Sequence, residues 1–131
     1  METIGYHYVV EAAGCDRELL AAPDRIREIF TRACSVGEMQ LKSTYFFRFS
    51  PKGVSGVAIL AESHISVHTW PDHGYAALDV YVCGERSEPE RAIDHILEEL
   101  RSSHAHISEL KRGIEDDHVY THAILTWEEE M

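Results

Sequence analysis

The chain of 131 residues is poor in basic side chains and has no long apolar run. It contains 12 Lys and Arg against 23 Asp and Glu, which gives a formal net charge of -11. This charge disfavours duplex nucleic acid and anionic membranes as partners, because both repel an acidic surface. No apolar stretch approaches the ~18 residues needed to span a bilayer, so we expect no insertion into a membrane.

The chain is also poor in cysteine. Its three cysteines, Cys15, Cys34 and Cys83, form no CxxC pair, which argues against a structural zinc knuckle. Their odd number and wide spacing are compatible with reduced thiols. The N-terminal segment shows neither the basic region nor the apolar core of a signal peptide. We therefore expect a cytoplasmic protein in which residues 1–131 form a single domain.

The remaining sequence alternates β-rich segments with two amphipathic stretches. Pro23 can occupy the first turn of a helix whose apolar residues recur at helical spacing until Gly37, and Pro89 opens a second helix. Strands are predicted over residues 3–12, 39–49, 54–61, 64–70, 75–83, 106–111 and 119–127.

Short turns between neighbouring strands favour antiparallel pairing. Two helices on one face of that sheet would make an α+β fold, specifically a two-layer α/β sandwich. The other face of the sheet must then contact solvent or a second copy of the chain.

The segment from Glu62 to Gly84, ESHISVHTWPDHGYAALDVYVCG, carries the residues of greatest chemical interest. A Glu-Ser bond is followed by the imidazole of His68 and the thiol of Cys83, across a Pro/Gly turn. Taken alone, each of these residues is most simply structural. Residues 64, 66, 68 and 70 share one strand face, and Ser63 belongs to the other. His68 can therefore reach Ser63 only if the chain bends or Ser63 lies at an irregular start of the strand.

Taken together, these residues resemble the processing segment of the small, prokaryotic form of S-adenosylmethionine decarboxylase, a pyruvoyl-dependent family. The shared pattern is a Glu-Ser bond, then His-Thr-Trp-Pro and an acid, then Gly-Tyr-Ala, and a final Cys-Gly. The acid is Asp72 here, where the family usually has Glu. The pair Cys15-Asp16 and the segment from Arg48 to Gly56 also resemble the family.

The resemblance implies a proenzyme that cleaves itself between Glu62 and Ser63. Residues 1–62 would become the β chain and residues 63–131 the α chain, with a pyruvoyl group derived from Ser63 as the cofactor. His68 would act as the acid and base of processing, and Ser55 would help position the reacting carbonyl. The pyruvoyl group would form a Schiff base with an amino acid, and Cys83 would return a proton to the substrate Cα.

The resemblance also implies a substrate pocket. Phe49 and Trp70 match aromatic residues of the adenosyl pocket, and Asp72 matches the acid that contacts the ribose. Asp is shorter than Glu by one methylene, about 1.5 Å. Tyr6 and Phe47 replace a basic residue and a histidine that are usual in the family.

The implied activity is that of a lyase of polyamine biosynthesis, which converts S-adenosylmethionine to CO2 and its decarboxylated form, the aminopropyl donor for spermidine. An acid in a reshaped pocket would also suit a cationic tail, so arginine or ornithine decarboxylation is an alternative. A second alternative is an unprocessed, non-catalytic partner of an active relative.

The resemblance finally implies a homodimer of processed protomers, with a small-molecule substrate bound near their interface. Metal dependence is not expected. His118 and His122 are four residues apart, which in a strand spans ~13 Å and excludes a shared ion. His104 and His106 could share a strand face, but no third ligand is evident nearby.

Overall fold

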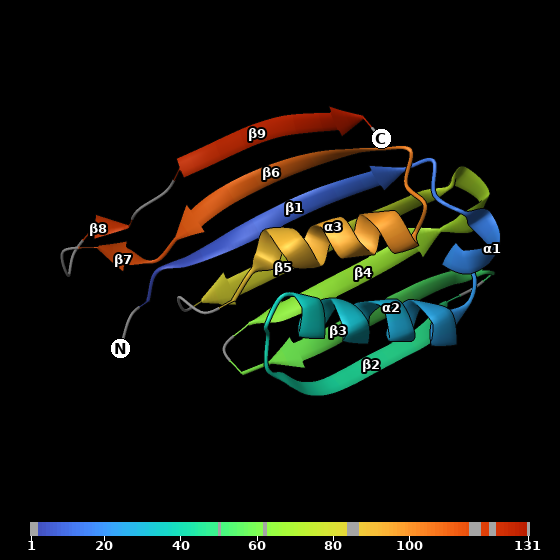
Figure 1. The fold of residues 1–131 in the computed structure, drawn as a ribbon, viewed down its shortest axis with the longest axis horizontal. Helices are drawn as coiled ribbons and strands as arrows, with labels where there is room; N and C mark the ends of the chain where they lie inside the picture. The colour runs from blue at the N-terminus through green and yellow to red at the C-terminus, as the bar shows by residue number, and fades with distance from the viewer. Residues whose placement is uncertain are drawn as a thin grey trace.

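The computed structural model describes residues 3–49, 51–61, 63–83 and 87–114, and the backbone of residues 115, 119–120 and 123–130. Seven antiparallel strands form one sheet in the order β2-β3-β4-β5-β1-β6-β9 (Figure 1). Their bounds are β1 Gly5–Ala13, β2 Leu41–Phe49, β3 Gly53–Leu60, β4 His64–Trp70, β5 Tyr75–Cys83, β6 His104–Arg112 and β9 Ala123–Glu130. A separate pair is formed by β7 (Ile114–Glu115) and β8 (Val119–Tyr120).

Two long helices, α2 (Pro23–Val36) and α3 (Pro89–Glu99), lie across the same face of the sheet (Figure 1). The α+β two-layer sandwich expected from the sequence is thereby confirmed. Both helices begin with a proline in the first turn, where its missing N–H costs no hydrogen bond. Among the described residues, no helix has both the length and the apolar character needed to cross a membrane.

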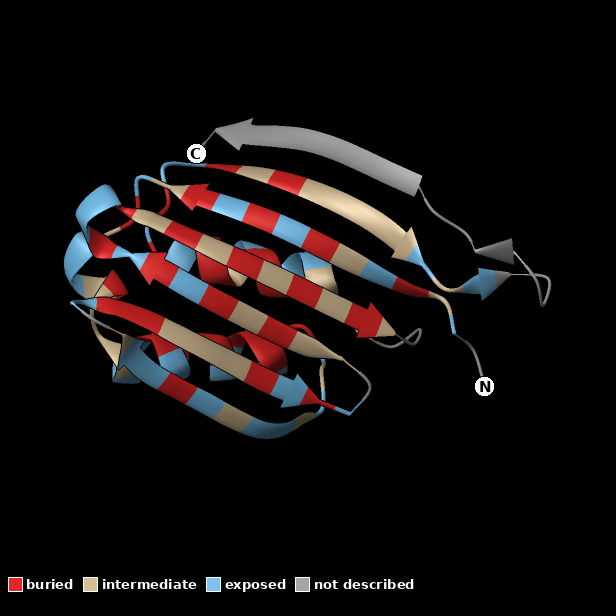
Figure 2. Cartoon of the chain, turned by 180° about the vertical axis from the view of Figure 1, so that it is seen from behind, coloured by how far each residue is buried: buried red, intermediate tan, exposed pale blue. Residues whose placement is uncertain are grey.

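Alternation along the central strands builds the core between sheet and helices (Figure 2). Ile65 and Val67 of β4, and Leu78 and Val80 of β5, point toward the helices and are buried. The buried helix residues recur at helical spacing: Ile26, Ile29, Phe30, Ala33 and Cys34 on α2, and Ala92, Ile93, Ile96 and Leu97 on α3. Each large aliphatic side chain buried here contributes about 1.5–3 kcal/mol, so this layer fixes the sheet register.

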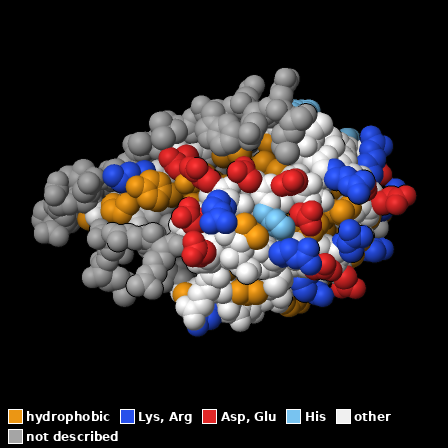
Figure 3. Space-filling view, in the orientation of Figure 1, with side chains coloured by type: hydrophobic (Ala, Val, Ile, Leu, Met, Phe, Trp, Pro, Cys, Tyr) orange, Lys and Arg blue, Asp and Glu red, His pale blue; other side chains and the backbone are white. Residues whose placement is uncertain are grey.

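The outer side of the helices is charged and suited to water. Acidic and basic side chains are interspersed over α2 and α3 (Figure 3). Arg32 lies 3.2 Å from Glu28 and 3.9 Å from Glu99, and Arg27 lies 3.1 Å from Asp24. These pairs are exposed, so each contributes little to stability.

The opposite side of the sheet, here called the open face, consists of the outward residues of β2 to β6. One of its rows runs Phe47, Ser55, His68, Ala77 and Glu11 across five neighbouring strands. Among the described residues, no helix covers this face (Figure 2). It exposes large apolar side chains: Val9, Tyr45, Phe47, Ile59 and Trp70.

Several elements differ from the expectation. A short helix, α1 (Arg17–Leu20), follows β1, and Asp16 caps it by accepting a hydrogen bond from the Leu19 N–H at 3.0 Å. Strand β6 begins at His104 rather than at residue 106. The predicted strand 119–127 is divided, because β8 pairs with β7 whereas β9 pairs with β6.

Candidate active site

Ser63 lies in the turn between β3 and β4. The Leu60 N–H donates to the Ser63 carbonyl at 2.9 Å and closes this turn. Ser63 precedes the first residue of β4, so it occupies the irregular strand start that the sequence allowed. Glu62, the other residue of the predicted cleavage bond, lies outside the described residues.

Cys83 lies at the same end of the sheet as Ser63. His64 is paired with Tyr81 across the antiparallel strands β4 and β5, so residue 63 and residue 83 both extend beyond that pair. Cys83 is half-buried and its thiol donates to the hydroxyl of Tyr81 at 3.3 Å. Cys15 and Cys34 are buried elsewhere, and burial raises the pKa of each thiol to about 11.

Ser55 and His68 form a second predicted pair, farther along the open face. They are directly opposite each other on β3 and β4, and Ser55 Oγ lies 2.8 Å from His68 Nδ1. This contact occupies one ring nitrogen and leaves Nε2 available to a reacting group. The His68 side chain is exposed on the open face.

The structure does not bring His68 and Ser63 together within one chain. They are five positions apart along the chain, which corresponds to about 16 Å at the rise of an extended strand. An imidazole cannot bridge that distance. The predicted residues therefore form two groups, Ser63 with Cys83 at one end of β4, and Ser55 with His68 toward the other.

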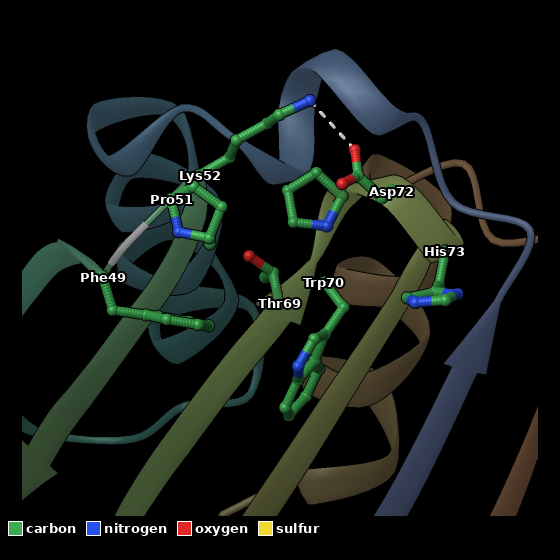
Figure 4. A pocket seen from close by; sticks show the side chains of 9 residues that line it. Phe49, Pro51, Lys52, Thr69, Trp70, Asp72 and His73 are labelled. Carbon is green, nitrogen blue, oxygen red and sulfur yellow. Dashed lines mark hydrogen bonds and ion pairs between the residues drawn. The ribbon is translucent and has the colours of Figure 1, made fainter.

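The predicted substrate residues Phe49, Trp70 and Asp72 line one hollow of about 120 Å³ next to the second group (Figure 4). The rings of Phe49 and Trp70 meet edge to face, 6.3 Å between centroids. On its other side Trp70 stacks on Tyr75 at 5.2 Å. A side chain at Gly53 would collide with the Phe49 ring, so glycine lets this ring lie against β3.

The carboxylate of Asp72 is held by a cation. Lys52 Nζ lies 3.0 Å from Asp72 Oδ1, and both line the hollow (Figure 4). The hydrogen bond and charge of Lys52 keep the pKa of Asp72 below its ordinary value of 3.8. The acid is therefore ionised and already paired before any ligand arrives.

Two residues at this end of the sheet line the hollow but are not among the site residues predicted from the sequence. Lys52 has no pattern that links it to Asp72, because their contact joins two turns. Thr69 is fully buried under the hollow, where its hydroxyl donates to the Leu20 carbonyl at 2.7 Å and accepts from the Val54 N–H at 2.8 Å. Its inward position follows from strand alternation, and that signal could have found it.

Within the described part of the chain, no group of three or more His, Cys, Asp or Glu side chains could hold a metal ion. His104 and His106 lie on the same face of β6, because alternate residues of a strand point to the same side. His118 and His122 lie outside the described residues.

Comparison with known proteins places this arrangement in a family. The sequence model described as S-adenosylmethionine decarboxylase matches residues 6–113. The S-adenosylmethionine decarboxylase proenzyme of Pyrococcus furiosus is 67% identical over 132 aligned positions, which cover 100% of this chain and 95% of the relative. The chain belongs to the S-adenosylmethionine decarboxylase family.

The resemblance to the S-adenosylmethionine decarboxylase family extends to bacterial members and to the fold. The proenzyme of Caldicellulosiruptor saccharolyticus is 42% identical over 114 positions, covering 87% of this chain and 92% of that protein. The crystal structure of the adenosylmethionine decarboxylase from Aquifex aeolicus VF5 superposes with a TM-score of 0.81 at 34% identity, covering 91% of this chain and 98% of that chain. The match to the family model includes both groups of predicted residues.

Proposed function

We propose that the chain is a self-processing carboxy-lyase that converts S-adenosylmethionine to CO2 and decarboxylated S-adenosylmethionine. The product would serve as aminopropyl donor for spermidine. One observation carries the choice of substrate: Phe49, Trp70 and Asp72, assigned to adenosine recognition by resemblance, line a single hollow. The free state of Cys15, Cys34 and Cys83 supports a cytoplasmic location.

Processing would divide the chain into residues 1–62 and 63–131. Ser63 lies in a turn outside the strand ladders, where its hydroxyl can attack the preceding carbonyl without breaking a strand pair. A nucleophilic hydroxyl needs a neighbouring base, and His68 Nε2 is the nitrogen left available by Ser55. Ser55 would hold the ring in the orientation that presents Nε2.

The position of residue 63 fits a pyruvoyl group. The group would replace Ser63 itself, at a chain end in the β3–β4 turn, on the same sheet end as Cys83. It would supply an electron sink for loss of the carboxylate, as pyridoxal phosphate does. Cys83 Sγ would hold the proton that the substrate Cα receives.

The site requires a second copy of the chain. Ser63 and His68 lie about 16 Å apart along β4, too far to act together in one protomer. A two-fold axis between two stacked open faces, crossing the strands, would reverse the partner's strand direction. The Ser63 end of one chain would then lie over the His68 and Trp70 end of the other. The exposed Tyr45, Phe47 and Ile59 support burial of this face.

The hollow suits a nucleoside better than a cationic amino acid. Adenine can stack on Phe49 or Trp70, since either ring offers an apolar face. Asp72 can accept from a ribose hydroxyl while Lys52 donates to the same diol. A guanidinium or ammonium tail would instead have to displace Lys52 from Asp72 or approach its charge at close range. This observation ranks arginine and ornithine below S-adenosylmethionine.

The purified wild-type chain tests the proposal. Intact-mass measurement should give two fragments, residues 1–62 and residues 63–131. The fragment of residues 63–131 should react with carbonyl reagents. Release of labelled CO2 should be observed with carboxyl-labelled S-adenosylmethionine and not with arginine or ornithine. A single uncut chain without activity would support the non-catalytic partner instead, and faster release from arginine or ornithine would overturn the substrate assignment.

A further inference from the structure

Tyr81 is in direct contact with the proposed proton donor. Tyr81 and Cys83 are two residues apart on β5, so both side chains point to the open face. The Cys83 thiol donates to the Tyr81 hydroxyl oxygen at 3.3 Å, which is hydrogen-bonding distance for sulfur. The direction of the S–H bond is therefore set by a neighbouring side chain.

The Tyr81 ring is itself held from three sides. The guanidinium carbon of Arg112 lies 4.7 Å from the ring centroid, in a cation–π contact. The His64 ring is tilted at 5.9 Å, and the His7 ring meets it edge-on at 6.3 Å. His7 is in turn fixed by Asp79, 2.9 Å from its Nε2. A ring with neighbours on these sides keeps one position, and so does its hydroxyl.

A glycine on the adjacent strand makes room for this contact. Gly5 is paired with Cys83, and a Cβ atom on Gly5 would lie 3.0 Å from Cys83 Sγ and 3.0 Å from Tyr81 Cε1. The same Cβ would lie 2.8 Å from the Val82 carbonyl oxygen. Only glycine lets thiol and phenol approach each other under β1 without a shift.

We infer that Tyr81 is a positioning residue that holds Cys83 Sγ in place for proton transfer to the substrate Cα and then stabilises the thiolate left behind. The inference rests on the proposed function, which makes Cys83 the proton donor. Before substrate binds, the phenol oxygen accepts the S–H hydrogen bond, and for the transfer the S–H bond turns from Tyr81 toward Cα. During transfer the proton moves from Sγ to Cα, and Sγ keeps the electron pair as a thiolate. The Tyr81 O–H can then turn and donate to that thiolate, which later regains a proton from water.

The state of the phenol agrees with this role. The hydrogen bond from Cys83, together with partial burial, raises the pKa of Tyr81, so the hydroxyl keeps its own proton at neutral pH. A protonated phenol can both accept from a thiol and donate to a thiolate, whereas phenylalanine can do neither.

The test has a spectroscopic arm and a kinetic arm, both on the full chain. The first uses the uncut Ser63→Ala chain, in which the infrared S–H band of Cys83 is identified by subtracting the spectrum of the same chain with Cys83→Ala. Tyr81→Phe should move this band to the higher frequency of a free thiol. Tyr75→Phe removes another phenol from the same face of β5, one that donates to Glu11 at 2.7 Å, and should leave the band in place.

The kinetic arm uses the processed enzyme with S-adenosylmethionine. Tyr81→Phe should lower kcat roughly two- to tenfold at unchanged KM, the effect of one lost hydrogen bond in the transition state. It should also raise inactivation per turnover. A proton delivered away from Cα leaves the substrate nitrogen on residue 63, which becomes alanine, while the substrate leaves as an aldehyde after addition of water. The fraction of alanine-terminated chains is read by mass spectrometry.

The outcomes separate this inference from the proposed function. An S–H band that does not move in Tyr81→Phe, or one that moves without any rise in inactivation per turnover, would overturn the role of Tyr81. Gly5→Ala is a second test of the contact. Its added Cβ should disturb the infrared S–H band of Cys83 although Tyr81 is retained. No CO2 release by the wild-type chain would overturn the proposed function, and the infrared result would still report on the Tyr81–Cys83 contact.

Discussion

The two ends of β4 carry different chemical groups. At the Ser63 end, the chain leaves the sheet in a turn, and the neighbouring side chains are a thiol, a phenol and imidazoles. At the Trp70 end, aromatic rings and an ion pair line a hollow above a buried threonine. In the proposed function, the first end supplies the serine and the thiol, and the second supplies the recognition surface together with the processing base His68. Because about 16 Å of strand separates them, the proposed function gives each chain two halves of different sites rather than one whole site.

The largest effect is expected at the Ser63 end. Ser63→Ala removes the hydroxyl that starts processing, so the chain should remain at full mass and lose activity by more than about a thousandfold. Mass spectrometry and CO2 release measure the two consequences. Cleavage of Ser63→Ala at the same bond would contradict the assignment.

Co-expression can test whether the two ends meet across chains. Ser63→Ala and His68→Ala should each be uncut and inactive alone. Expressed together with different tags, they should form mixed dimers in which the intact Ser63 of one chain faces the intact His68 of the other. Random pairing restores about a quarter of the wild-type number of sites.

Two quantities are measured. The first is cleavage of the His68→Ala chain, which is identified by its tag, and the second is the recovered activity. If cleavage never appears in the mixed sample, the site does not combine the two chains as proposed.

A smaller effect is expected at the recognition end. Phe49→Leu keeps an apolar side chain but loses the aromatic face, and base stacking contributes about 1–3 kcal/mol, so KM for S-adenosylmethionine should rise roughly five- to hundredfold. The value of kcat should stay within about twofold, since the reacting groups lie at the other end. Phe49→Tyr keeps the ring and is the matched control. A fall in kcat without a change in KM would contradict this division of tasks.

The smallest effect is expected from the ion pair over the hollow. Lys52→Ala removes an exposed partner of Asp72, so KM for S-adenosylmethionine should rise only about two- to fivefold. Lys42→Ala, which removes an exposed lysine on β2 away from the hollow, is the control. New activity toward arginine or ornithine in Lys52→Ala would show that Lys52 had excluded cationic tails. If KM does not change with any of the three substrates, the Lys52–Asp72 ion pair has a structural role only.

Much of the fold could be predicted from short-range sequence patterns, namely strand alternation and helix capping. Alternation along residues 64–70 and 75–83 places Ile65, Val67, Leu78 and Val80 on one side of the sheet, and the structure buries all four. The helix starting at Pro23 and the stop at Gly37 follow from capping preferences. The grouping of Phe49 with Trp70 could be anticipated by resemblance, since these residues are distant in sequence.

The rest depends on contacts that local pattern does not encode. Helix α1 has only four residues, too short for a periodic signal, and the bond from buried Thr69 to Leu20 ties its end to β4. The Lys52–Asp72 pair joins two turns whose geometry the packed sheet decides. The distance between Ser63 and His68 was implicit in the strand prediction, but only the observed pairing of His68 with Ser55 showed that the strand does not bend.

The position of β1 would have a consequence for the molecule after the proposed cleavage between residues 62 and 63. Strand β1 belongs to residues 1–62, yet it is inserted between β5 and β6, which belong to residues 63–131. The two proposed fragments would therefore interlock, and separating them would mean opening the strand ladders on both sides of β1 as well as the ladder between β3 and β4. Before cleavage, assembly of the sheet is an intramolecular event, whereas afterwards it is a bimolecular encounter between two partial sheets without a tether.

The cut form should accordingly unfold slowly but refold poorly on dilution, whereas the uncut Ser63→Ala chain should recover. Comparing refolding yields of the two at several protein concentrations measures this difference. In this fold, cleavage in the turn proposed to yield the reactive group would also reduce the chain's ability to fold again, so each enzyme molecule would depend on the structure it acquired before cleavage.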